Sequence, residues 1–167
     1  MKGYKNKLFA SILAIAMLFV FSSCEGYDYK WRDATMDMSA VITASPNGTI
    51  RADLPIGYDW VVANGRYNRI DDITYYGGRI EIITNGNYID NLYLTLSNSN
   101  AVLNIAWKDR RSGTIYDDDP YVDDFLYAIT EVVRRYGYAT IYVNGYSDRS
   151  ARFELNFMID INAYVQY

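Results

Sequence analysis

The sequence predicts a mainly β protein, an antiparallel β-sandwich of about seven to nine strands with one helix near residues 120–136. Many segments alternate apolar and polar residues with a period of two, which is the pattern of a half-buried strand. Asn-Gly and Gly-Gly pairs, which favour turns, recur between these segments. A single segment has the spacing of an amphipathic helix instead.

The first predicted strands lie on either side of Asn47-Gly48. In the segment before this pair, one face carries Met36, Met38, Ala40 and Ile42. Residues 49–54 alternate in the same way. Asn47 and Gly48 both tolerate the positive φ that a type I′ turn requires. We therefore predict a β-hairpin that turns at this pair.

Further strands follow the same pattern along the chain. Segments around residues 79–82, 91–97 and 103–107 alternate, and turn signals occur at Asn64-Gly65, Gly77-Gly78, Asn85-Gly86 and Asn98-Ser99-Asn100. Residues 141–143 begin a final hairpin that turns at Asn144-Gly145 or just beyond. Residues 152–162 then form a long last strand, which could bend or serve two sheets.

The predicted helix has start and stop signals as well as periodicity. Its apolar stripe consists of Val122, Phe125, Leu126, Ile129, Val133 and Tyr136. Asp119 can cap the start, and Pro120 suits the first helical position. Gly137 can end the helix, and Arg134 and Arg135 favour the negative end of its dipole.

The N-terminus has the three parts of an export signal. Lys2, Lys5 and Lys7 precede an apolar stretch that ends at Phe21 and is too short for a membrane span of about 20 residues. Phe21-Ser22-Ser23-Cys24 resembles the lipobox of bacterial lipoproteins of the Bacteroidota type, with Phe21 in place of the usual Leu. The resemblance implies that a diacylglyceryl group joins the Cys24 sulfur, that the signal is removed, and that the new amine is acylated.

Three segments follow from this interpretation. Residues 1–23 are the signal, residues 24–35 are the lipidated Cys24 and a tether, and residues 36–167 form one β-sandwich domain. The acyl chains make the membrane the first partner, and we expect outer-membrane localisation. Surface-exported lipoproteins of Bacteroidota often carry acidic residues just after the Cys, and Glu25 and Asp28 match this partly. The match favours the outer leaflet slightly.

Composition excludes several classes of function. The chain has 16 Lys and Arg against 20 Asp and Glu, and the signal holds three of the basic residues and none of the acidic ones. Nucleic acid is therefore not an expected partner, because phosphate binding needs clustered positive charge. With no His and one Cys, the chain lacks the usual catalytic triads and an internal disulfide. We expect no cofactor and no enzymatic activity.

The acidic run Asp117-Asp118-Asp119 is the candidate metal site, because Ca²⁺ prefers six to eight oxygen ligands. The order of residues does not fit an EF-hand loop. The favoured alternative is an N-cap with further acidic residues near the positive end of the helix dipole.

Aromatic residues supply the candidate ligand-binding residues. The chain has 18 Tyr and 3 Trp, and Tyr suits sites that are buried at one end and wet at the other. Tyr58 and Trp60 follow Pro55 in a loop-like stretch, and Tyr75-Tyr76 precede two glycines. Exposed rings at these positions could stack on a glycan or enter a groove on a protein partner. Core packing is the favoured alternative for Trp60 and for Trp107.

Three functions remain open at this point. The leading one is a membrane-anchored, non-enzymatic module for surface binding, adhesion or nutrient capture. The second is a periplasm-facing structural or assembly lipoprotein of the envelope, and the third is a carboxylate-based hydrolase. Residues 120–165 are similar in pattern to Ig-like domains of Bacteroidota lipoproteins, a resemblance that carries no functional residues.

Overall fold

The computed structural model describes residues 28–63, 68–106, 112–147 and 150–167. The predicted signal, Cys24, the Asn64-Gly65 turn and Trp107 lie outside these residues. No helix within the described ranges is both long and apolar enough to cross a membrane.

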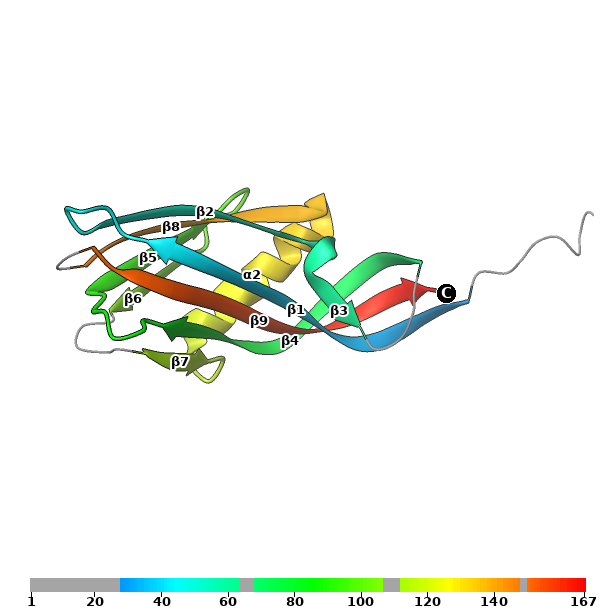
Figure 1. The fold of residues 1–167 in the computed structure, drawn as a ribbon. Coiled ribbons are helices and arrows are strands. Elements are labelled where there is room, and N and C mark those ends of the chain that lie inside the picture. The colour runs from blue at the N-terminus through cyan, green and yellow to red at the C-terminus, as the bar shows by residue number, and fades with distance from the viewer. Residues whose placement is uncertain (1–27, 64–67, 107–111, 148–149) are drawn as a thin grey trace, which may run out of the picture.

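Two antiparallel sheets face each other, which confirms the predicted β-sandwich (Figure 1). The five-stranded sheet has the order β3 (Val61–Ala63), β1 (Tyr29–Thr43), β9 (Arg152–Gln166), β4 (Arg69–Ile83) and β7 (Ser112–Tyr116). The four-stranded sheet has the order β2 (Thr49–Gly57), β8 (Tyr138–Tyr146), β5 (Asn91–Leu96) and β6 (Val102–Ala106). A short 3₁₀ helix, η1 (Tyr58–Trp60), joins β2 to β3.

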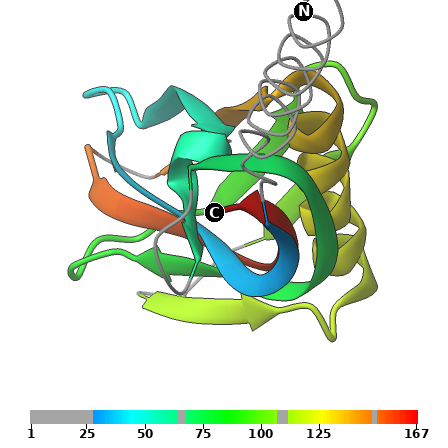
Figure 2. The ribbon, with the colours of Figure 1, turned by 90° about the vertical axis from the view of Figure 1, so that its right-hand side faces the viewer.

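The helix α2 (Pro120–Tyr136) has the predicted bounds and caps. The Asp119 side chain accepts a hydrogen bond from the Tyr121 N–H, and Gly137 ends the helix with φ +83°. The helix contacts β4 and β7 of one sheet and β6 and β8 of the other. It therefore closes one open side of the sandwich, as the view in Figure 2 shows. Its Phe125, Leu126 and Ile129 side chains join the core between the sheets.

Three long strands of the five-stranded sheet reach beyond the rest of the fold. β1, β9 and β4 extend past α2 and the four-stranded sheet at the end where the C-terminus lies (Figure 1). β1 begins at Tyr29 and not at Met36, so the second half of the predicted tether belongs to the sheet. Every residue of β1 from Tyr29 to Thr43 pairs with β9.

The predicted first hairpin is wrong, although its turn exists. The Gly48 N–H donates to the Ser45 carbonyl at 2.8 Å, and Gly48 has φ +84°. The two strands beside this turn nevertheless join different sheets, since β1 pairs with β9 and β2 pairs with β8. Asn47 does not have the positive φ of a type I′ turn. The turn is a connection between layers.

Two other predicted turns lie inside strands. Asn144 and Gly145 belong to β8, which lies in a different sheet from β9, so these two strands form no hairpin. Gly77 and Gly78 lie within β4 at a bulge opposite β9. A Cβ on Gly78 would approach the Met158 carbonyl oxygen to 2.5 Å. Gly78 therefore serves a close approach of two strands, and Gly77 lies against the Asp117 side chain.

Two predicted turns are confirmed. Asn85 and Gly86 have φ of +49° and +87°, as a type I′ turn requires. Asn98 has φ +55° in the connection between β5 and β6, which pair as a hairpin.

Candidate functional site

The outer face of the five-stranded sheet is polar where its inner face is apolar. Along β1 the Met36 and Met38 side chains are buried, and Asp37 between them is exposed. Along β9 the Ile159 side chain is buried against the core, and its neighbour Asp160 faces the other way. Because successive side chains of a strand point to opposite faces, every second side chain of three neighbouring strands lies on one outer surface.

This outer surface contains a hollow of about 490 Å³, which we call the sheet hollow. Three strands supply most of its lining, with Asp33 and Asp37 from β1, Met158 and Asp160 from β9, and Tyr76 and Arg79 from β4. The hollow is open, so it suits a ligand that lies along the surface. Its lining combines an aromatic ring, hydrogen-bond acceptors and a guanidinium donor, a set of groups that can orient a polar ligand.

Cross-strand pairing fixes the positions of these groups. Thr35 lies opposite Asp160 on β9, and its hydroxyl donates to Asp160 Oδ1 at 3.3 Å. Asp37 and Arg79 both lie opposite Met158, one from each neighbouring strand. The side chains therefore stand on paired backbone and not on a loop, which favours a preformed site.

Tyr76 is the exposed aromatic residue of the sheet hollow, with 57% of its surface accessible. Partial desolvation, followed by the carboxylates of Asp160 and Asp33, raises the pKa of the Tyr76 phenol above its usual value. The phenol therefore stays protonated near neutral pH and can donate a hydrogen bond. Three carboxylates against one guanidinium give the described lining a net negative charge.

A second aromatic group continues this face toward the end of the sheet. The rings of Tyr29 and Tyr164 stack with centroids 5.4 Å apart, and Trp31 lies 5.2 Å from Tyr164. Trp31 is 49% exposed although it belongs to a paired strand. Asp33, which lines the sheet hollow, follows Trp31 on the same face of β1.

The predicted pair Tyr75-Tyr76 is divided between two faces of β4. The Tyr75 hydroxyl donates to Asp123 Oδ1 at 2.6 Å, and its ring meets Tyr127 of α2 edge to face. Burial and the bond to Asp123 raise the pKa of Tyr75. Tyr75 therefore connects the sheet to the helix, and Tyr76 alone of the pair lines the sheet hollow.

Tyr58 and Trp60 lie in η1, on a different surface from the sheet hollow. Both line a shallow depression of about 320 Å³ with Gly137 and Tyr138. Trp60 is 38% exposed, so the expectation that it packs in the core is wrong. Trp107 lies outside the described residues.

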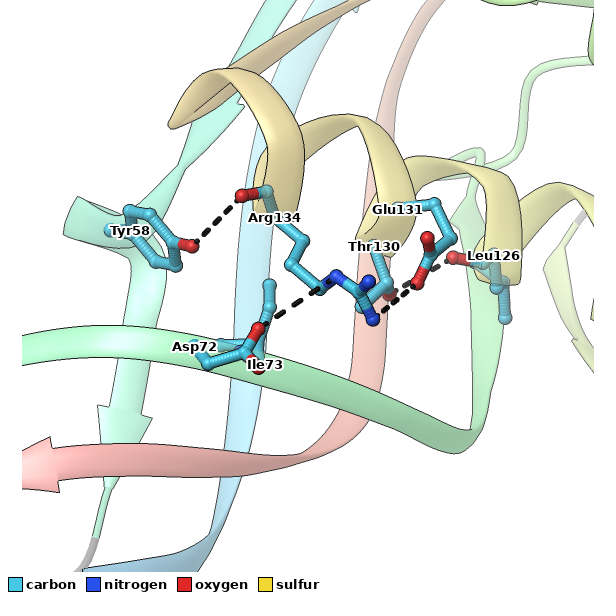
Figure 3. A network of polar contacts seen from close by, with 7 residues as sticks. All are labelled: Tyr58, Asp72, Ile73, Leu126, Thr130, Glu131 and Arg134. Carbon is cyan, nitrogen blue, oxygen red and sulfur yellow. Dashed lines mark hydrogen bonds and ion pairs between the residues drawn. The ribbon is translucent and has the colours of Figure 1, made fainter.

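Polar contacts tie Tyr58 to the end of the helix (Figure 3). The Tyr58 hydroxyl lies 3.5 Å from the Arg134 carbonyl oxygen. The Arg134 guanidinium lies 3.2 Å from Glu131 and 3.7 Å from Asp72 on β4. Burial, and then the charge of Asp72, raise the pKa of Tyr58 against the opposing effect of Arg134. These contacts hold η1, β4 and α2 together, which is a structural role.

The acidic run before α2 makes backbone contacts. Asp119 Oδ1 accepts from the Tyr121 N–H at 2.9 Å, and Asp117 Oδ2 accepts from the Gly78 N–H at 2.9 Å. Asp118 is exposed. The described ranges contain no group of three or more Asp, Glu, His or Cys residues placed to hold a metal ion.

Sequence reasoning missed most of the sheet hollow. Its lining residues are far apart in the chain and carry no motif. The alternation of Trp31, Asp33, Thr35 and Asp37 along one strand is the available signal, but most of it falls within residues 24–35, which the sequence predicts to be a tether. No family model, curated protein or solved structure matches the chain.

Proposed function

We propose that this chain is a lipid-anchored, non-enzymatic binding module of the outer membrane, and that the sheet hollow holds a glycan. The observation that carries the proposal is the exposed Tyr76 ring in a hollow lined by Asp33, Asp37, Asp160 and Arg79. An amphipathic ring can stack on the apolar face of a sugar. Carboxylates accept hydrogen bonds from sugar hydroxyls, and a guanidinium donates to ring and hydroxyl oxygens.

The charge of the sheet hollow favours one class of glycan. Its net negative lining repels uronic and sialic acids and leaves neutral or amino sugars as the better ligands. The open shape, formed on a sheet face, suits a chain of several sugar units more than an enclosed monosaccharide.

The binding test compares two exposed tyrosines on opposite sheets. The purified protein is screened in detergent on neutral, amino and acidic glycans, and the affinity for the best ligand is measured for two variants. We expect Tyr76→Ala to weaken binding by about tenfold or more, since an aromatic platform often dominates such a contact. Tyr93→Ala, which removes a 43% exposed ring from β5, should leave the affinity unchanged. Equal affinities for the wild type and Tyr76→Ala would contradict the proposal that the sheet hollow binds the glycan.

Two further assays separate the alternatives. Protease treatment of intact cells removes a surface-exposed protein, whereas a periplasm-facing envelope protein is cut only after the cells are opened. A periplasmic marker controls for leakage. If the protein releases reducing sugar from a glycan, and the Asp160→Asn variant does not, the result would favour a carboxylate-based hydrolase over a binding module.

A further inference from the structure

The end of the five-stranded sheet carries aromatic and cationic side chains on both faces. We call this set the tip cluster, and its members are Tyr29, Lys30, Trp31, Arg32, Tyr164 and Tyr167. Tyr29, Trp31 and Tyr164 form the aromatic group on the outer face. On the opposite face the Arg32 guanidinium lies 5.7 Å from the Tyr167 ring centroid, and Arg32 Nε donates to the Tyr167 hydroxyl at 2.8 Å. Lys30 lies 5.9 Å from the same ring centroid.

The tip cluster lies at the start of β1 and the end of β9, and these ends of the strands extend past the four-stranded sheet and α2 (Figure 1). Tyr29, Trp31 and Tyr167 are all among the exposed large side chains. A single exposed aromatic residue is ordinary, but several together on a projecting end indicate a surface that binds a partner or a membrane.

The short connection to Cys24 decides what that surface can meet. Five residue steps separate Cys24 from Tyr29, and a chain spans at most about 3.6 Å per residue. If Cys24 carries acyl chains, Tyr29 lies within about 18 Å of the lipidated sulfur. The headgroup regions add about 10 to 15 Å in total to a hydrocarbon core about 30 Å thick. The tip cluster is therefore confined to the neighbourhood of the headgroups.

Its composition fits that location. Trp and Tyr concentrate at membrane–water interfaces, because their rings are apolar and their N–H and O–H groups are polar. Lys and Arg side chains there place their charges among lipid phosphates. Lys30 and Arg32 lie at this end of a chain with a net charge of −4. Because Lys30 also forms an ion pair with Asp28, the aromatic rings contribute more to the argument than the local charge.

We infer that the tip cluster docks into the headgroup region of the membrane that holds the lipid anchor, with Trp31 as its most inserted ring. The inference rests on the proposed lipidation of Cys24. Docking fixes the orientation of the domain, so that β1 rises away from the membrane. Trp31 and Asp37 are six residues apart on β1, which places the sheet hollow up to about 20 Å above the inserted ring. A glycan in the sheet hollow would then lie close to the membrane surface.

Fluorescence quenching tests the docking. The full-length lipoprotein is reconstituted into phosphatidylethanolamine–phosphatidylglycerol vesicles that contain a phosphatidylcholine brominated on its upper acyl carbons. Wild type is compared with Trp31→Phe and with the matched control Trp60→Phe. Trp60 adjoins β3, whose Val61 lies opposite Met36, well up the strand from the tip. We expect Trp31→Phe to lose most of the emission that brominated lipid quenches and Trp60→Phe to retain it. Matching circular dichroism spectra show that the variants fold.

The outcomes separate docking from anchoring. A protein without acyl mass on Cys24, or one that does not float with vesicles, contradicts the anchor and removes the basis of the inference. A protein that is acylated and floats, but has equal lipid quenching in the wild type and Trp31→Phe, overturns the docking alone. In that case acrylamide distinguishes a tip in water, where Trp31 is quenched, from a tip covered by a second copy of the chain, where it is shielded.

Discussion

Replacement of Asp119 tests whether the acidic run before α2 works as a helix cap. The Asp119 carboxylate accepts one hydrogen bond from the Tyr121 N–H at 2.9 Å. Loss of such a cap costs about 1 kcal/mol, and loss of a negative charge at a helix N-terminus costs about 0.5 kcal/mol more. We therefore expect Asp119→Ala to lower the free energy of unfolding by about 1 to 1.5 kcal/mol.

Two companion variants isolate the capping bond. Asn caps as well as Asp, so Asp119→Asn should lose only the charge effect of about 0.5 kcal/mol. Asp118→Ala removes a nearby carboxylate that is exposed, and should change the free energy by less than about 0.5 kcal/mol. Urea denaturation followed by circular dichroism gives these values. In thermal scans the loss in Asp119→Ala corresponds to about 4 °C per kcal/mol for a domain of this size.

The same variants distinguish capping from metal binding. The melting temperatures are measured in EDTA and in Ca²⁺. If Asp119 acts as a cap, the melting temperature of Asp119→Ala is lower than that of Asp119→Asn in both solutions. The melting temperature of the wild type is then the same in EDTA and in Ca²⁺. If Asp118→Ala loses as much as Asp119→Ala, and EDTA lowers the wild type to the same level, the run binds a cation and the capping argument is refuted.

Two further predictions concern the sheet–helix contact and the turns. Tyr75→Phe removes the 2.6 Å bond to Asp123 and should cost about 1 to 2 kcal/mol. Because the folded state raises the pKa of Tyr75, this stabilisation is complete below the unfolded value of about 10 and is lost at higher pH. Urea unfolding should therefore show a constant difference between the two proteins up to about pH 10 and a shrinking difference above it. A Cβ on Gly48 would overlap the Ser147 carbonyl oxygen, whereas a Cβ on Gly86 meets open space, and both glycines have positive φ. Gly48→Ala should therefore destabilise by several kcal/mol and Gly86→Ala by about 1 kcal/mol, and equal losses in urea denaturation would contradict the clash.

The sequence predicts those elements whose causes are local. The bounds of α2 follow from a cap, a proline, a 3.6-residue period and a C-terminal glycine within one short segment. Strand character follows from alternation in the same way, as residues 152–162 within β9 illustrate.

Strand partners depend on contacts that no local pattern encodes. Asn47-Gly48 turns the chain, but the buried faces of β1 and β2 pack in opposite layers, so the two strands do not pair. Gly77-Gly78 has the composition of a turn, but both residues pair with β9 within a strand, and Gly78 packs closely against the β9 backbone. The sheet hollow cannot be predicted from the sequence for the same reason. Asp33, Arg79 and Asp160 lie close together only because β9 lies between β1 and β4 in the sheet.

The continuous pairing of β1 with β9 gives an anchored form of this protein a particular response to mechanical load. A pull on a bound ligand would reach the membrane through Tyr29, the first residue of β1, along the axis of that strand. All fifteen residues of β1 pair with β9, and ladder hydrogen bonds lie perpendicular to the strands. Such a pull shears the bonds together and does not unzip them one by one. Unfolding of the domain under such a load would then follow the rupture rate of this ladder and not the equilibrium stability of the domain.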